Sequence, residues 1–127
     1  GDQVILALSR ILRQRLRKAD LMGRYGGEEF AIILPDINVE QAMNVVNDLR
    51  KTFHNISFTS EESSFSCTLS AGVSFFPLFT NKHELVNSAD EALYKAKNTG
   101  RNRVVAYTEL EKKPWQDGLN DESGNNV

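Results

Sequence analysis

The first hydrophobic pattern along the chain is helical. Apolar residues recur at intervals of three and four, at Val4, Ile5, Leu8, Ile11, Leu12 and Leu16. Basic residues lie between them, at Arg10, Arg13 and Arg17. This spacing places the apolar side chains on one stripe and the charges outside it. We therefore predict an amphipathic helix over this region, with Gly1-Asp2 inside the helix or at its edge.

A double glycine separates the next two short runs. Residues 20–25 lead into Gly26-Gly27, and the apolar residues 30–34 follow, bounded by Pro35-Asp36. Paired glycines between two extended segments are typical of a hairpin turn. We expect the two flanking segments to be antiparallel neighbours.

Two further helices and two strands complete the pattern. Asn38 with Gln41 predicts a capping box at the start of a second helix, and Asn81 with Glu84 predicts one before a third helix that ends at Gly100. Residues 55–64 are polar and predict a loop or a weak strand. Residues 65–76 predict a strand in which Gly72 marks a bulge or a close backbone approach, and residues 103–107 predict a final strand.

The predicted order of helix, two strands, helix, strand, helix and strand indicates an α+β domain with a mainly antiparallel sheet flanked by helices. Such a domain would ordinarily have one more strand before its first helix. We expect residues 1–107 to form this single domain. Residues 108–127 are dominated by Asn, Asp, Gly and Ser and predict a disordered tail.

Composition restricts the class of protein. Hydrophobic residues make up 40% of the 127 positions and charged residues 25%, as in ordinary soluble domains, and the apolar runs are too short to cross a bilayer. The single cysteine, Cys67, cannot form an internal disulfide and is interpreted as a small core residue, in keeping with a cytoplasmic domain. Without a zinc-finger or RRM pattern, nothing indicates nucleic-acid binding.

The net charge of −2 hides an uneven distribution. Residues 1–24 hold six basic residues against two acidic ones, whereas the last twenty residues hold two lysines against five acids. The basic segment fits either attraction of an anionic ligand or the solvated face of a helix, and charge alone favours the solvated face.

The adjacent acids Glu28 and Glu29 also have two interpretations. Acids beside a hairpin turn are usually solvated surface groups. In a strand the two side chains point to opposite faces, so they cannot face one ligand equally. The alternative is that carboxylate oxygen at the turn holds Mg²⁺, while Gly26 and Gly27, lacking Cβ, let a nucleotide approach the backbone closely.

Longer motifs favour the functional alternative. The segments are Arg24-Tyr-Gly-Gly-Glu-Glu-Phe30, Ser70-Ala-Gly-Val-Ser74, Ala89-Asp-Glu-Ala-Leu-Tyr-Lys-Ala-Lys97 and Gly100-Arg-Asn-Arg103. Together they resemble the signature, a later strand and the closing block of the GGDEF-domain diguanylate cyclase family, in its GGEEF form. The resemblance covers residues 1 to about 107. It implies a fold akin to nucleotide cyclases and polymerase palms, and condensation of two GTP into cyclic di-GMP and two pyrophosphates.

The resemblance also implies a role for each matching residue. Glu28 would be a metal ligand and the base for the attacking 3′-hydroxyl, with Mg²⁺ or Mn²⁺ as the metal, and Glu29 would complete the acidic site. The substrate-binding residues implied by position are Gly26 and Gly27 against GTP, Lys97 and Arg101 on its phosphates, and Asp2 on guanine. A carboxylate suits guanine because it accepts hydrogen bonds from both N1–H and the exocyclic amine.

Arg17 and Asp20 form an RxxD motif that the family uses as an inhibitory site for its product. By itself the motif would be an ordinary helix-end pair, but its offset from Gly26 favours the inhibitory site. Some relatives offer a second arginine from the next helix, and the aligned residue here is Asp48. Arg50 is two positions away and would point differently.

The family resemblance further implies a partner and a missing part. Two domains must bring two GTP molecules together, so catalysis needs a homodimer, and we expect sensory or membrane domains upstream in the parent protein. The family's first strand, with its DxDxFKxxND segment, does not appear, so we expect the 127 residues alone to have little or no cyclase activity. The alternatives are a non-catalytic cyclic di-GMP sensor and a GTP-binding regulatory module.

Overall fold

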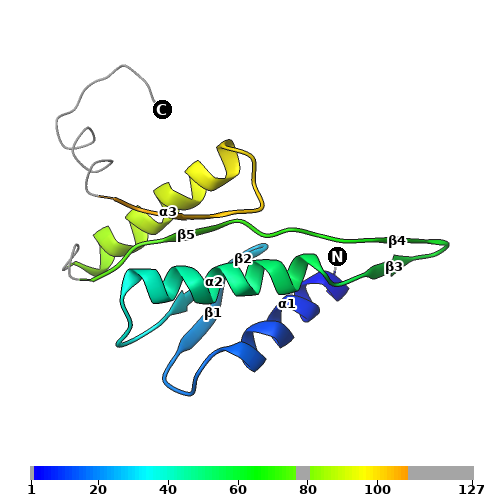
Figure 1. Ribbon diagram of the computed structural model, residues 1–127, viewed down its shortest axis with the longest axis horizontal. Coiled ribbons are helices and arrows are strands. Elements are labelled where there is room, and N and C mark those ends of the chain that lie inside the picture. The colour runs from blue at the N-terminus through cyan, green and yellow to red at the C-terminus, as the bar shows by residue number, and fades with distance from the viewer. Residues whose placement is uncertain (1, 77–80, 109–127) are drawn as a thin grey trace.

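The computed structural model describes residues 2–76 and 81–108 (Figure 1). Its helices and strands follow the predicted order, with one additional hairpin after the second helix. The elements are α1 (Asp2–Arg15), β1 (Leu21–Gly26), β2 (Glu29–Ile33), α2 (Val39–His54), β3 (Phe58–Ser60), β4 (Ser63–Phe65), β5 (Ala71–Val73), α3 (Lys82–Asn98) and β6 (Val104–Ala106). The expected α+β class is confirmed.

The larger hydrophobic cluster joins α1 and α2. It is built from Ile11, Leu12, Leu49, Phe53 and Phe58, all of which are at most 6% exposed. The first predicted helix is therefore confirmed, with its apolar stripe turned inward. Inward-facing residues of the β1–β2 hairpin pack against the same cluster, and half-buried Cys67 does so too.

The capping box predicted for α2 is present. The Asn38 side chain accepts a hydrogen bond from the Gln41 N–H at 2.8 Å, and the Gln41 side chain accepts one from the Asn38 N–H at 3.0 Å. These reciprocal bonds satisfy two backbone donors that a helix start leaves unpaired. At α3 only one half of the predicted box is formed: the Asn81 side chain accepts from the N–H groups of His83 and Glu84, and the Glu84 side chain makes no return bond to Asn81.

A second, smaller unit consists of β5, α3 and β6. The two strands are parallel, with Gly72 paired to Val105, and α3 crosses between them. Buried Ala92 and Tyr107 form the centre of its hydrophobic cluster. At Gly72 an added Cβ would collide with backbone atoms of α3, so the predicted close backbone approach is confirmed.

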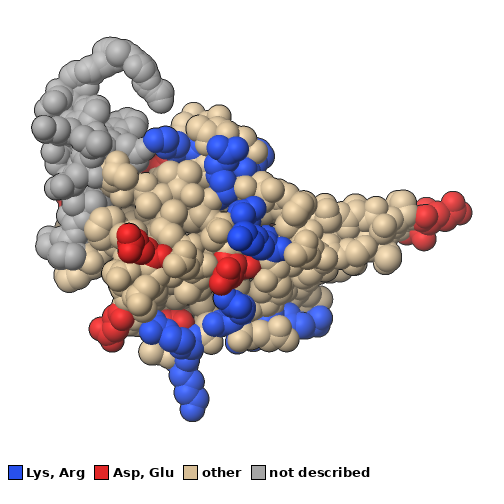
Figure 2. Space-filling model, viewed as in Figure 1, with Lys and Arg blue, Asp and Glu red and all other residues tan. Residues whose placement is uncertain are grey.

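The segment from residue 55 to residue 76 differs from the sequence prediction. The expected continuous strand over residues 65–76 is wrong, because only Ala71–Val73 is β-strand there and Phe65 ends a separate hairpin. That hairpin pairs β3 with β4, and the rings of Phe58 and Phe65 stack at 5.6 Å. Figure 1 shows it as an arm that projects from the body, and Figure 2 shows acidic side chains at its tip.

Within the described residues the strands form three separate two-stranded sheets. The β1–β2 and β3–β4 pairs are antiparallel and the β5–β6 pair is parallel. The predicted tail over residues 108–127 lies, apart from Thr108, outside the described residues. In the described part of the chain, no helix combines the length and apolar character needed to span a bilayer.

Candidate nucleotide site

The β1–β2 turn presents an open backbone surface. Gly27 has a φ of 34°, a conformation that side chains rarely adopt, and a Cβ built at Gly26 or Gly27 would have no atom within 4 Å. The turn is also held in shape by Arg24, whose Nε and Nη2 donate to the Gly27 carbonyl at 2.9 and 2.7 Å. A register shift between Arg24 and Gly26 marks a bulge just before the turn. A ligand could therefore lie directly against the two glycines.

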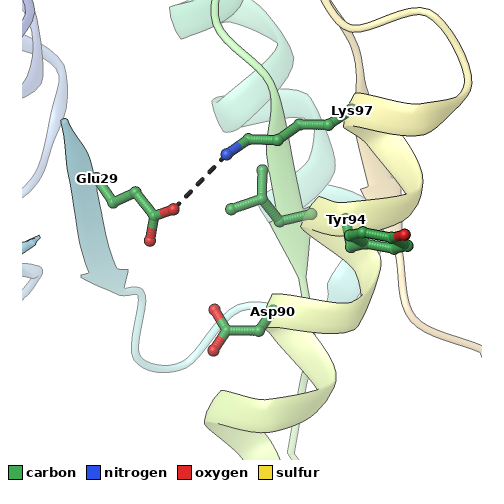
Figure 3. A pocket seen from close by; sticks show the side chains of 5 residues that line it. Glu29, Asp90, Tyr94 and Lys97 are labelled. Carbon is green, nitrogen blue, oxygen red and sulfur yellow. Dashed lines mark ion pairs between the residues drawn. The ribbon is translucent and has the colours of Figure 1, made fainter. Parts of the chain in front are cut away.

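Beside this hairpin is a cavity of about 250 Å³ between β2 and α3 (Figure 3). It is lined by Glu29 from β2 and by Asp90, Leu93, Tyr94 and Lys97 from α3. The four α3 positions are spaced by three, one and three residues, so they share one helical face. In Figure 3 the side chains of Glu29 and Lys97 extend toward each other across the cavity.

The Lys97 Nζ lies 3.6 Å from a carboxylate oxygen of Glu29. Their side chains are 38% and 44% exposed, so water screens the pair, and its contribution to stability is below about 1 kcal/mol. Such a pair separates at little cost. An anionic ligand can thus bind Lys97 in place of Glu29, and a cation can bind Glu29 in place of Lys97.

The predicted site residues are only partly brought together. Glu29 and Lys97 line the same cavity, and Gly26 and Gly27 lie at the adjacent turn. Glu28 is exposed in that turn and is not among the cavity-lining residues. Among the remaining predictions, Arg101 is exposed just beyond α3, and Asp2 is exposed at the first position of α1; neither lines the cavity.

Four residues at this site were given no separate role by the sequence analysis. Asp90, Leu93 and Tyr94 line the cavity, and Arg24 shapes the turn. Asp90 and Tyr94 lie seven and three positions before Lys97, so a helical projection of the third helix would have placed them on the lysine's face. The Arg24 contact depends on the turn conformation, which sequence spacing does not specify.

The described residues contain no group of three or more His, Cys, Asp and Glu side chains arranged to hold a metal ion. Magnesium is commonly held by only one or two carboxylates together with water and substrate phosphates. Glu28 and Glu29 beside an open turn meet that smaller requirement, with Asp90 as a further carboxylate on the cavity wall. The donor set therefore fits a phosphate-bound Mg²⁺ and does not fit an all-protein metal cage.

Arg17 and Asp20 form a tight pair after α1. Arg17 donates to the Asp20 carboxylate from Nη2 at 2.6 Å, from Nε at 3.0 Å and from its backbone N–H at 2.7 Å. The Asp20 side chain is only 3% exposed. The side-chain hydrogen bonds from Arg17 lower the pKa of the Asp20 carboxyl and raise the pKa of the guanidinium. Nη2 of Arg17 also donates to the Pro35 carbonyl at 2.7 Å, so the arginine is oriented on two sides.

The second helix does not add a free arginine to this pair. Asp48 forms an ion pair at 2.9 Å with Arg15 on α1. Arg50 donates instead to Asn47 and to Asn102, which lies in the turn after α3. Arg50 thus points toward the turn after α3, and the prediction that it points in a different direction from position 48 is confirmed.

A family model described as the diguanylate cyclase GGDEF domain matches residues 1–103. That match covers most of the chain, and the chain therefore belongs to the GGDEF family of diguanylate cyclase domains. The predicted resemblance to this family is confirmed.

Curated relatives agree with the family assignment. Diguanylate cyclase DgcM of Escherichia coli K12 is 39% identical over 106 residues, which are 84% of this chain and 25% of that protein. Diguanylate cyclase DgcP of Pseudomonas aeruginosa is 36% identical over 104 residues, 82% of this chain and 16% of that protein. The chain thus spans a quarter or less of the length of these two relatives.

Solved structures show the same fold. The active GGEEF domain of a diguanylate cyclase from Vibrio cholerae superposes with a TM-score of 0.77 at 33% identity, covering 86% of this chain and 69% of that one. The GGDEF domain of DgcB from Caulobacter crescentus, solved in complex with c-di-GMP, gives a TM-score of 0.79 at 29% identity, covering 84% and 64%.

Proposed function

We propose that this domain is the catalytic part of a diguanylate cyclase. Two copies, each holding one GTP, join their substrates: the 3′-hydroxyl oxygen of each GTP bonds to the α-phosphorus of the other, and each bond to pyrophosphate breaks. The observation that carries the proposal is the open glycine turn beside a cavity in which Glu29 faces Lys97. Acidic and basic groups on opposite walls suit a metal-bound triphosphate.

Each residue has a separate task in this reaction. Gly26 and Gly27 lie against GTP, Lys97 and Arg101 bind its phosphates, and Asp2 accepts hydrogen bonds from guanine, as the family pattern implies. Lys97 is available because its pair with Glu29 is long and exposed. Catalysis then depends mostly on holding two substrates in line, which converts a bimolecular step into one within a complex.

We infer that Glu28 and Glu29 serve the metal and the proton. Glu28 is exposed at the open turn, where it can accept the 3′-hydroxyl proton as base, and Glu29 lies on the cavity wall. Bound Mg²⁺ would neutralise phosphate charge and so favour departure of pyrophosphate. Mn²⁺ has the same preference for oxygen ligands.

We further propose that Arg17 and Asp20 bind the product and inhibit the enzyme. The planar guanidinium suits guanine or phosphate of cyclic di-GMP, and the Asp20 carboxylate suits a guanine edge. Their mutual hydrogen bonds and the Arg17–Pro35 bond support the proposal because they hold both groups in place before any ligand arrives. Product must exchange some of these internal bonds for its own.

The cyclase proposal is tested with Mg²⁺–GTP in the longest natural chain that contains these residues, by measuring cyclic di-GMP formation. Glu28→Gln and Lys97→Gln should each lower turnover by about 100-fold or more. Glu62→Gln, on the exposed β3–β4 turn, is a matched charge change and should leave the rate unchanged. Turnover at the normal rate in both site variants would overturn the proposal.

The 127-residue chain by itself is proposed to be a poor cyclase. Each copy holds only one of the two substrates that the reaction joins, so a single chain has no second GTP with which its own GTP can react. We propose dimerisation as the requirement for turnover, sensory or membrane domains elsewhere in the parent protein as its control, and a cytoplasmic location for this domain. Efficient cyclic di-GMP production by dilute, monomeric chain would contradict this part of the proposal.

A further inference from the structure

The connection between α3 and β6 has an unusual backbone. Gly100, Arg101 and Asn102 all have positive φ, at 131°, 58° and 50°. Glycine adopts this region freely and asparagine tolerates it, but for arginine the Cβ is crowded against the backbone. The surroundings of Arg101 must therefore hold it in this conformation.

Besides the bond from Arg103 Nε to the Arg101 carbonyl at 3.1 Å, which lies within the turn, three hydrogen bonds tie the turn to its surroundings. The Arg101 N–H donates to the Ala96 carbonyl at 2.9 Å, and the Asn102 N–H donates to Ser70 Oγ at 3.1 Å. The third bond comes from α2: Arg50 Nη1 donates to Asn102 Oδ1 at 2.9 Å. Asn102 is thus bonded through its backbone to Ser70, just before β5, and through its side chain to Arg50 of α2.

The guanidinium of Arg50 is itself fixed in direction. Its Nε donates to Asn47 Oδ1 at 2.8 Å, while Nη1 reaches Asn102 across 52 positions of sequence. Both bonds are partly buried. A planar guanidinium can make two such bonds at a set angle, whereas a lysine has a single nitrogen on a flexible stem.

The side chain of Arg101, by contrast, is exposed, and it makes no hydrogen bond or ion pair with any other residue that the structure describes. Its direction depends on the backbone from which it starts. We propose that Arg50 is a positioning residue: by holding Asn102 it fixes the backbone that aims Arg101 at the phosphates of a bound nucleoside triphosphate. This inference rests on the proposed function, in which Arg101 contacts GTP phosphates.

The test measures the dissociation constant of Mg²⁺–GTP for the full chain and its variants. Arg50→Gln should weaken binding by about tenfold. Lys51→Gln is the matched control, because it removes the same charge from the next, exposed position of α2, and it should leave the affinity unchanged. An unchanged affinity in Arg50→Gln would overturn the inference.

A double variant separates positioning from general damage to the fold. If Arg50 acts only through Arg101, Arg50→Gln should cause no further loss of GTP affinity in an Arg101→Ala background. A loss of the same size in both backgrounds would show that Arg50 acts elsewhere. Asn102→Gly removes the acceptor without straining the backbone, so it should reproduce the Arg50→Gln loss; an unchanged affinity would contradict the proposed link.

A measurement without nucleotide distinguishes failure of this inference from failure of the proposed function. In ¹H–¹⁵N NMR spectra, Arg50→Gln should displace the amide signals of Arg101 and Asn102, whereas Lys51→Gln should not. If the signals are displaced but the unmodified chain does not bind GTP, the proposed function is overturned. In that case Arg50 holds the turn but positions no phosphate ligand. Undisplaced signals would overturn the positioning role whatever the chain binds.

Discussion

The contact between Gly72 and α3 makes a sharp prediction about stability. A methyl group at position 72 would collide with the backbone nitrogen of Leu93, the carbonyl oxygen of Ala89 and the carbonyl carbon of Ala92. Backbone atoms of a helix cannot rotate away as the end of a side chain can. In Gly72→Ala, α3 must therefore move as a body away from β5 and disturb the cluster around Ala92.

The magnitude follows from two opposing terms. Overpacking of this kind costs about 1–3 kcal/mol and can cost more when backbone has to shift. Replacing glycine by alanine also restricts the unfolded chain, which stabilises the fold by about 0.4–1 kcal/mol where the native backbone allows it. At Gly72 the cost of overpacking exceeds the stabilisation from restricting the unfolded chain. We therefore expect Gly72→Ala to lower the free energy of unfolding by about 1–2 kcal/mol.

Gly23 provides the matched control. It lies in β1 without a positive φ, and an added Cβ would have no atom within 4 Å, so Gly23→Ala should be neutral or slightly stabilising. Urea unfolding of both variants at one temperature gives their free energies of unfolding. Equal m-values, the slopes of free energy against urea concentration, show that the two values can be compared. Equal stability of Gly72→Ala and Gly23→Ala would refute the close-packing argument.

Three further predictions concern the core, a helix cap and an ion pair. Leu49→Ala should lower the free energy of unfolding by about 2–5 kcal/mol because Leu49 is 2% exposed, whereas Leu6→Ala, at 61% exposed, should change it little; similar losses would contradict the assigned core. Asn38→Ala should cost about 1 kcal/mol by removing the α2 cap, and Asn44→Ala on the exposed face of the same helix should cost nothing, again by urea unfolding. Asp20→Asn should lower the free energy of unfolding at neutral pH, as measured by urea unfolding. Because Arg17 lowers the pKa of Asp20 in the folded state, this difference in free energy from the unmodified chain should persist above about pH 4. It should vanish as the pH falls through the lowered pKa of Asp20. A difference that grew on acidification would refute this assignment.

The sequence predicts those elements whose signals are local. Asn38 and Gln41 are three positions apart, and the bonds they form in the structure are the ones their spacing predicts. The β3–β4 hairpin was not predicted as a hairpin, and its turn explains why. Glu61 occupies positive φ at 46°, a place where glycine or asparagine would have signalled a turn.

The site is predictable to the same limited extent. The glycine turn and Lys97 are recognisable from motifs. Helical periodicity also places Asp90 and Tyr94 on the face of α3 that carries Lys97. The contact from Arg50 to Asn102 joins residues 52 positions apart, and no periodicity links them. Long-range hydrogen bonds of this kind depend on how α2 packs beside β6, which only the folded chain determines.

The division of the interior into two hydrophobic clusters has a consequence for motion. The β2 wall of the cavity packs on the α1–α2 cluster, whereas the α3 wall lies on the helix that forms the smaller cluster around Ala92 and Tyr107. Units with separate cores can open one at a time, and the smaller core opens at lower free energy. Amide hydrogen exchange should accordingly be faster in α3 than in the central turns of α2. Opening of the smaller unit separates Lys97 from Glu29 without unfolding the rest, so a ligand that bridges the two walls would slow exchange throughout α3.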